Sequence, residues 1–295
     1  MVVVAALLPL LVHTLPGDAA DIIAGPGADA ATVDRLGHGL GLDAPLVEQV
    51  TGSVGDTLRG DLGRSVLTGD PVAGTIGERL VASAWIVLPA WCTAILVGAW
   101  VSARCALRPG GRGRLVAVLC GVPEAVVAVA LVVVLGAWLG VLPAVSLVEP
   151  GRSVLTTPRV LVLPVLALAV PATAWMIRMS TGVARDVAAR DHVQDALDRG
   201  RSPAEVARRH VLPAMTPTLA QLSAVSAGAL LAGSVVIEQV VAYPGLGEML
   251  ASAVAGRDLP VIRGTAVVMA AVGALLLGAA DLCAREVRRR MHATS

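Results

Sequence analysis

Charged residues are scarce in this chain. Only 15% of its 295 residues are charged, whereas 56% are hydrophobic and the mean hydropathy is +0.77. Soluble globular domains carry about 25% charged residues. The shortage of charge, more than the apolar excess, indicates an integral membrane protein.

Several kinds of site lack the residues that they need. Phenylalanine is absent and every basic residue is arginine, which we interpret as genomic codon bias rather than function. The four cysteines form no C-x-x-C pair and the five histidines show no ligand spacing, so no metal site is predicted. The chain has no G-x-x-x-x-G-K-[ST] phosphate loop, so it is not expected to hydrolyse ATP. A net charge of +1 gives no indication of a nucleic-acid partner.

Long uncharged runs predict an all-α membrane protein with six transmembrane helices. About 20 residues cross a bilayer as a helix, and all but one of the runs reach or approach that length. The exception is the first, which we interpret as a transmembrane helix with an incomplete start, a signal-peptide core being the alternative. The runs are residues 2–12, 80–103, 125–148, 160–177, 214–237 and 264–280.

The distribution of arginine predicts the orientation. Seven arginines lie between Arg178 and Arg209, and four more follow each of the second and sixth runs, whereas the alternate loops are short and hold few. By the positive-inside rule, the arginine-rich loops and both termini are cytoplasmic, in a multi-pass protein of the cell membrane. Residues 16–79 carry ten acidic residues against four arginines. We predict a first helix in 1–15, an external insert in 16–79 and a five-helix core in 80–295.

The longest charged segment between two apolar runs is Asp186 to Pro217. Its first part predicts one polar helix, Asp186–Arg199, with ion pairs four residues apart between Asp186 and Arg190 and between Asp195 and Arg199. Gly200 is predicted to stop this helix at its C-terminal cap.

A second, short basic helix is predicted directly after Gly200. Ser202 is expected as its N-cap, Pro203 as its first residue and Glu205 as the other half of a capping box. The helix is predicted to end before Pro213, and Thr216-Pro217 is predicted to start the next apolar helix.

The spacing within this segment resembles the cytoplasmic coupling loop of ABC importer permeases. Gln194-Asp195-Ala196 precedes Gly200 at the family's distance, and His210-x-Leu212-Pro213 follows it. The leading Glu of the pattern is replaced by Gln194, its first Ala by Asp195 and its Ile by His210. Further segments resemble the dipeptide, oligopeptide and nickel permeases with a large external insert: Leu15–Asp18, Leu40–Leu46, Gly60–Ser65, Gly233–Glu238, Tyr243–Gly247 and Arg257–Val261.

The resemblance implies a type I importer permease and its partners. These would be a second homologous permease subunit, two cytoplasmic ATPase subunits that bind the ATP, an external substrate-binding protein and the lipid bilayer. The chain itself would hold no cofactor. Residues 180–215 would dock on an ATPase, with these candidate residues: Asp195, Ala196, Gly200, Ser202, Glu205, Arg208, Arg209, His210, Leu212 and Pro213.

Glu124 is the candidate pathway residue suggested by the sequence itself. It lies beside Pro123 in an otherwise uncharged run, where a carboxylate is costly and usually faces a cavity or a partner. The alternatives are a protonated Glu124 hydrogen-bonded across the bundle, or a helix that begins later. Resemblance to the family adds the candidate pathway or gate residues Ser234, Glu238, Tyr243, Pro244 and Gly245. Asp281 and Arg285 are expected to form a structural pair.

The function predicted from the sequence is the translocating permease of an ATP-driven peptide importer. The same machine importing nickel or another small solute is the nearest alternative. A passive channel is a rival from another class. An intramembrane enzyme is a further rival, but it would need paired catalytic groups, and the second to fifth runs offer only Glu124 among their carboxylates and no histidine.

Overall fold

A computed structural model describes most of the chain. The described residues are 59–107, 124–143, 145–146, 158–256 and 258–293, with residues 29, 45, 48, 51, 52, 55 and 56. The predicted first helix, the greater part of the predicted insert and residues 108–123 lie outside them. The chain divides into two compact units, Met1–Val81 with Gly245–Val272 and Ala82–Pro244 with Gly273–Ser295.

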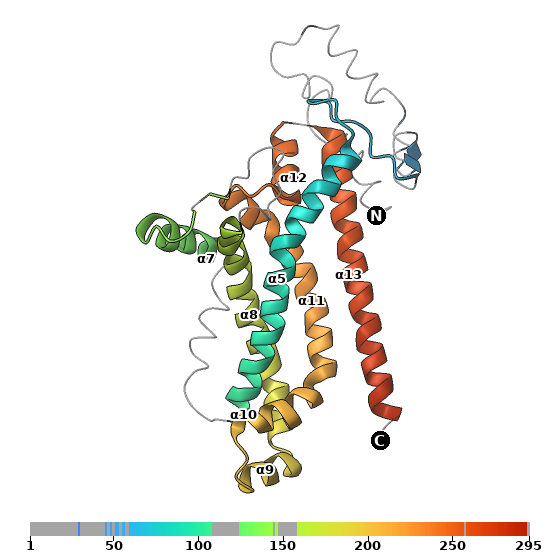
Figure 1. The fold of residues 1–295 in the computed structure, drawn as a ribbon. Coiled ribbons are helices and arrows are strands. Elements are labelled where there is room, and N and C mark those ends of the chain that lie inside the picture. The colour runs from blue at the N-terminus through green and yellow to red at the C-terminus, as the bar shows by residue number, and fades with distance from the viewer. Residues whose placement is uncertain are drawn as a thin grey trace. The chain divides into compact units, whose positions relative to one another are not determined.

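Helices make up nearly all the regular structure of the described residues (Figure 1). Four of them are long and apolar enough to cross a membrane: Val72–Ala106 (α5), Arg159–Ala188 (α8), Pro203–Val240 and Leu259–Ala279, the last being part of Leu259–Ala293 (α13). These confirm the runs predicted at 80–103, 160–177, 214–237 and 264–280, each in a longer helix. The prediction of six spans is confirmed for these four.

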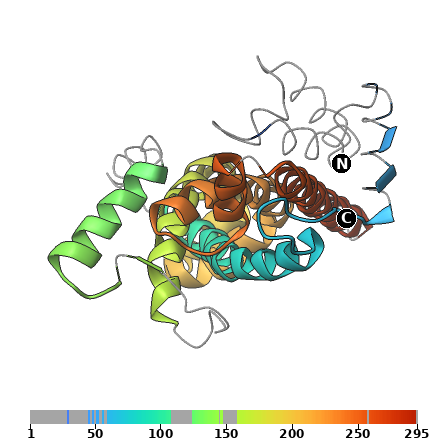
Figure 2. The same ribbon diagram turned by 90° about the horizontal axis from the view of Figure 1, so that it is seen from above.

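The run predicted as one span at 125–148 is interrupted. It forms α7 (Glu124–Leu131) and the π-helix η1 (Val132–Trp138), after which the chain turns at Leu139–Gly140. At 1.5 Å per residue the 15 residues from 124 to 138 span about 22 Å, less than the ~30 Å hydrocarbon core. Helix α7 lies across the direction of α8 rather than along it (Figures 1 and 2).

Small residues let α5 approach its neighbours in the second unit. Ala90, Ala94, Gly98 and Ser102 are buried and lie four residues apart, which places them on one face of the helix. A Cβ added at Gly98 would lie 2.5 Å from Cγ of Met176 on α8. The Trp91 indole N–H donates to the Ser223 carbonyl of α11 (Leu212–Val240) at 2.9 Å. Since helices inside a membrane are held by close packing, this stripe positions α5 against α8 and α11.

Two prolines inside helices leave a backbone carbonyl without its usual N–H donor, and a side-chain hydroxyl group donates to each of these carbonyls instead. Pro164 has no N–H for the Val160 carbonyl four residues earlier, and the Ser146 hydroxyl donates to that carbonyl at 2.8 Å. Pro217 likewise leaves the Pro213 carbonyl, to which the Thr216 hydroxyl donates at 2.8 Å. The helices therefore continue through both prolines without an unsatisfied backbone group at either carbonyl.

The first unit packs the start of α5 against α12 (Leu246–Ala255) and the start of α13. Val72, Ile76 and Leu80, which recur at four-residue spacing along α5, join one apolar cluster with Leu246, Met249 and Val261. Gly264 of α13 meets this face closely, because an added Cβ would lie 2.8 Å from Val72 Cγ1.

Gly98→Ala tests the close approach of α5 and α8. The added methyl group would overlap Met176, so we expect the free energy of unfolding to fall by about 1–3 kcal/mol despite the better helix propensity of alanine. The measurement is thermal unfolding in detergent. Gly182→Ala on α8 is the control, because nothing lies within 4 Å of its added Cβ. An equal melting temperature for both variants would contradict the packing.

Candidate functional site

The end of α8 and the short helix α9 (Asp191–Asp198) form the first half of the candidate segment. Arg190 separates them with extended backbone angles, φ −72° and ψ 142°. The single helix predicted over Asp186–Arg199 is therefore wrong. Neither predicted ion pair, Asp186 with Arg190 or Asp195 with Arg199, forms in the described structure, because Arg190 and Arg199 lie outside regular helix.

Gln194 closes the break between α8 and α9. Its side-chain Nε2 donates to the Ala188 carbonyl at the end of α8 over 2.7 Å. A carboxylate could accept but not donate this bond. The replacement of the family's Glu by Gln194 therefore has a structural role in this chain.

Gly200 ends α9 as predicted. Its φ of +79° is left-handed, a region that residues with a Cβ rarely adopt. The Gly200 N–H donates to the Leu197 carbonyl at 2.9 Å, and the Arg201 N–H donates to the Ala196 carbonyl at 3.2 Å. This pair of bonds is the Schellman motif, which satisfies the last carbonyls of the helix.

The next turn starts with the predicted cap but without the full capping box. The Ser202 hydroxyl accepts the Glu205 N–H at 3.2 Å, and Pro203 is the first residue of α10 (Pro203–Val206). The Glu205 carboxylate instead accepts from Arg201 at 3.3 Å and from Arg209 at 3.0 Å. Because these groups are half exposed, each pair stabilises the segment by no more than about 1 kcal/mol.

The predicted helix end before Pro213 and restart at Thr216-Pro217 are wrong. The chain continues through the π-helix η3 (Ala207–Val211) directly into α11, so residues 203–240 form one helix. The Leu212 N–H donates to the Ala207 carbonyl, five residues earlier. This wider turn gives the Pro213 ring room that a regular α-helical turn would deny it.

The segment is packed firmly onto the ends of the long helices. Val193 and Ala196 of α9 lie in one buried apolar cluster with Ala103 of α5, Val187 of α8 and Met215 of α11. Among the candidate residues, Ala196 is buried, Glu205, His210 and Leu212 are half-buried, and the others are exposed: Asp195, Gly200, Ser202, Arg208, Arg209 and Pro213. The structure thus presents a polar surface on a rigid base.

Two histidines far apart in the sequence meet in this segment. The rings of His192 on α9 and His210 on η3 have centroids 6.1 Å apart. Nε2 of His210 is buried and has no hydrogen-bond partner in the described structure. A buried polar atom left unpaired costs free energy. Sequence reasoning missed this pair, because only the turn at Gly200 brings the two positions together.

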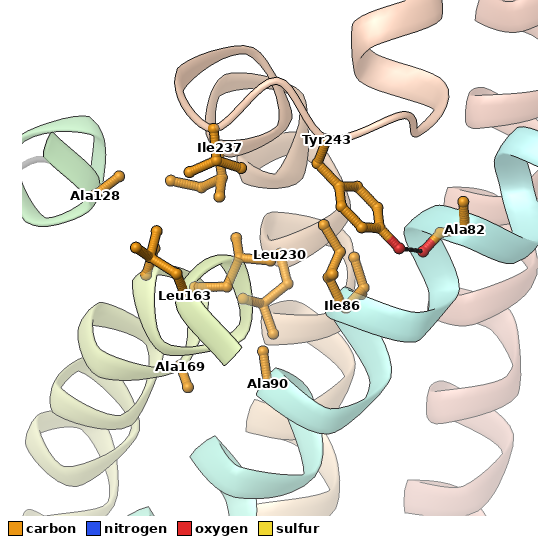
Figure 3. Packing of buried hydrophobic residues seen from close by; sticks show 13 residues of the cluster. Ala82, Ile86, Ala90, Ala128, Leu163, Ala169, Leu230, Ile237 and Tyr243 are labelled. Atoms are coloured by element: carbon orange, nitrogen blue, oxygen red, sulfur yellow. Dashed lines mark hydrogen bonds between the residues drawn. The ribbon is translucent and has the colours of Figure 1, made fainter. Parts of the chain in front are cut away.

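A second cluster lies at the other end of α11, where Tyr243 and Ala82 belong to a group of buried hydrophobic residues (Figure 3). Glu238 is fully buried and accepts the Ser83 hydroxyl of α5 at 2.7 Å. The Tyr243 ring is also fully buried, and its hydroxyl donates to the Ala82 carbonyl at 2.7 Å. Burial, and then the charge of Glu238, raises the pKa of the Tyr243 hydroxyl, which keeps it a proton donor. Both residues therefore bind the end of α11 to α5.

The turn after α11 has the same hydrogen-bond pattern as the turn at Gly200. The Tyr243 N–H donates to the Glu238 carbonyl at 2.8 Å, and the Ala242 N–H donates to the Gln239 carbonyl at 3.4 Å. Here the left-handed residue is Ala242, with φ +50°, rather than glycine. Its methyl group makes this conformation costly by about 1–2 kcal/mol.

Ser65 and Asp258 join two segments that resemble the family but are 193 residues apart. The Ser65 hydroxyl donates to Asp258 Oδ2 at 2.5 Å and accepts the N–H groups of Leu67 and Thr68. Asp258 Oδ1 accepts the Val66 N–H at 3.3 Å and the Val261 N–H at 3.4 Å, the latter in the first turn of α13. We call this arrangement the Ser65–Asp258 clasp. Sequence analysis identified both segments without connecting them.

Comparison with known proteins decides the family. Residues 85–293 match the family described as binding-protein-dependent transport system inner membrane components. The chain belongs to this family. It is a permease component of an ABC importer, and hence a transport component rather than an enzyme.

Relatives of the permease carry transport names. A protein of Brucella abortus named as a peptide transport system permease is 36% identical over 270 residues, covering 90% of this chain and 86% of the relative. The glutathione transport system permease protein GsiC of Escherichia coli O6:H1 is 33% identical over 267 residues, covering 88% of this chain and 84% of GsiC.

The other pathway candidates of the permease are placed as follows. Glu124 is the first described residue of α7. Ser234 is buried, and its hydroxyl donates to the Leu231 carbonyl within α11 at 3.0 Å. Pro244 is half-buried, and Gly245 is the N-cap of α12. Their roles in transport stay predictions. The predicted Asp281–Arg285 pair is confirmed at 2.7 Å.

His210→Ile should stabilise the permease. Isoleucine removes the buried unpaired nitrogen and restores the residue of the family pattern, so we expect a gain of about 1 kcal/mol, seen as a higher melting temperature in detergent. His192→Ile is the control, since His192 is exposed. A lower melting temperature for His210→Ile would show that Nε2 has a partner in solution.

Ala242→Gly tests the strained turn after α11. Glycine removes the left-handed penalty but adds conformational freedom to the unfolded chain, so we expect a net gain of about 0.5 kcal/mol. Ala73→Gly, at an exposed position of α5, should instead cost about 1 kcal/mol. If both substitutions destabilise equally in the same thermal assay, the turn is not strained.

Proposed function

We propose that this chain is the translocating permease of an ATP-driven importer of peptides. The relatives whose names refer to peptides and glutathione support this cargo class. By the positive-inside rule, the arginine-rich loops support a cytoplasmic position for residues 180–215 and both termini. The full protein would have six spans in the type I permease arrangement, with a second permease, two ATPases and an external binding protein as partners.

The coupling segment carries the proposal. Its α9 helix and Gly200 turn expose polar groups outward, while Val193 and Ala196 pack on the ends of α5, α8 and α11. An ATPase that pulls on the exposed face would therefore move these helix ends through packed contacts. Residues 203–240 form one helix from the docking face to the buried Glu238, so a displacement at one end reaches the other.

Glu238, Ser83 and Tyr243 would form the hinge or gate at the far end of this helix. Their hydrogen bonds fix the end of α11 to α5. Opening the pathway there would therefore either break these bonds or move α11 and α5 together. Glu124 remains a proposed contact for a cationic group of the cargo.

A matched pair of substitutions at Gly200 tests the coupling. Gly200→Asn should retain most uptake, since asparagine tolerates left-handed angles, whereas Gly200→Val should strain the turn and displace the docking face. The assay reconstitutes the permease in vesicles with its ATPases and binding protein and measures peptide uptake and ATP hydrolysis.

We expect Gly200→Val to insert normally and to lose at least about tenfold in uptake, with ATP hydrolysis no longer stimulated by loaded binding protein. Normal uptake by Gly200→Val would contradict the docking of this segment. If loaded binding protein stimulates ATP hydrolysis by the unaltered permease but no peptide is taken up, the proposed cargo is contradicted instead.

A further inference from the structure

An exposed row of mostly large apolar side chains follows one face of α5 within the second unit. Its members lie three or four residues apart, as neighbours on one face of a helix do, and all are exposed. We call this row the outer stripe of α5, and its residues are Trp85, Leu88, Cys92, Leu96 and Trp100.

The composition of the outer stripe favours lipid over another helix as its cover. Helices in membranes approach one another through small residues, and α5 carries Ala90, Ala94 and Gly98 on its buried face instead. The outer stripe has a tryptophan near each end, and tryptophan rings prefer the membrane–water interface. Trp85 and Arg104 lie 19 positions apart, a rise of about 28 Å, which matches the ~30 Å hydrocarbon core.

The outer stripe ends at a cation that an aromatic ring positions. Arg104 follows Trp100 by about one helical turn, and its Cζ lies 5.6 Å from the centroid of the Trp100 ring. Arg104 is half-buried and pairs with no carboxylate among the described residues. Its guanidinium N–H groups can therefore donate to an anion from outside the chain, and their planar fork fits two oxygens of a phosphate.

Arg104 lies at the coupling end of the bundle, in a basic part of the sequence. Its neighbour Ala103 is buried in one apolar cluster with Val193 of α9, so both belong to the same end of α5 as the coupling segment. The sequence has no acidic residue between Glu78 and Glu124, and three more arginines follow Arg104 by position 114. Basic residues directly beyond the cytoplasmic end of a span attract anionic lipids.

We propose that Trp100 and Arg104 bind the phosphate of an anionic phospholipid at the cytoplasmic face, with an acyl chain along the outer stripe. The guanidinium donates to the phosphate oxygens. The Trp100 ring holds it at the level of the headgroups while its own apolar body contacts the chain. The inference uses the proposed cytoplasmic position of the coupling segment and does not depend on the proposed cargo.

Quenching of tryptophan fluorescence by brominated lipid measures which lipid contacts the outer stripe. The full permease is placed in phosphatidylcholine nanodiscs that contain an equal small fraction of brominated phosphatidylglycerol or brominated phosphatidylcholine. We expect phosphatidylglycerol to quench more, because one ion pair at the surface should enrich it about two- to fivefold at the site. Since the chain has five tryptophans, Trp100→Leu should remove this difference, and Trp85→Leu should retain it.

Arg104→Gln removes the cation and should make the two brominated lipids quench equally. Arg199→Gln is the matched control, because Arg199 is exposed at the end of α9 and does not belong to α5. Equal quenching of the unaltered permease by the two lipids would overturn the inference. A difference that persists in Arg104→Gln would overturn it as well.

The assembled importer tests the competing occupant, a helix of the second permease. The signal of Trp100 is taken as the difference between the unaltered permease and Trp100→Leu, each with its partner subunits. We expect brominated phosphatidylglycerol to quench this signal after assembly as before it. If assembly abolishes quenching by both lipids, protein covers the outer stripe and the lipid site is wrong. No uptake is measured, so a failure of the proposed transport function would leave this result unchanged.

Discussion

The need to satisfy every backbone hydrogen-bonding group shapes this permease, because the hydrocarbon interior offers no water as a substitute. Prolines interrupt the helical ladder, and the structure answers the breaks at Pro164, Pro213 and Pro217 with specific devices. Ser146 serves the carbonyl freed by Pro164, Thr216 serves the one freed by Pro217, and a π turn makes room for Pro213. Helix α8 and the helix over residues 203–240 remain continuous at these prolines for that reason. In the proposed function, this continuity is what would let a cytoplasmic event act at a distance.

The same requirement fixes the helix ends, and the ends are where function is proposed. Gly200 and Ala242 each take left-handed angles in a turn that satisfies the final carbonyls of a helix. One turn presents the proposed docking face and the other positions Tyr243 against α5. In the proposed function, a continuous helix between two well-defined turns would act as a lever, whereas frayed ends would not transmit a displacement applied by an ATPase.

Local chemistry was predictable from the sequence, and nonlocal chemistry was not. Gly200, Ser202 and Pro203 occupy the predicted positions because caps depend on neighbours within four residues. The break at Arg190 was missed, since the Gln194–Ala188 bond that closes it competes with ion pairs that looked equally plausible. The helix end expected before Pro213 was wrong, because proline signals a break only when no wider turn absorbs it. The meeting of His192 with His210 required the fold itself.

The Ser65–Asp258 clasp shows why the family resemblance located two segments of the chain but did not predict the hydrogen bonds between them. Asp258 accepts from one hydroxyl and two backbone N–H groups, so a single carboxylate both caps α13 and holds the loop before α5. Asparagine could keep some of these bonds, but it would lose the charge that favours a helix N-terminus. The loop and the helix are therefore specified together, by residues 193 positions apart that no local sequence pattern could connect.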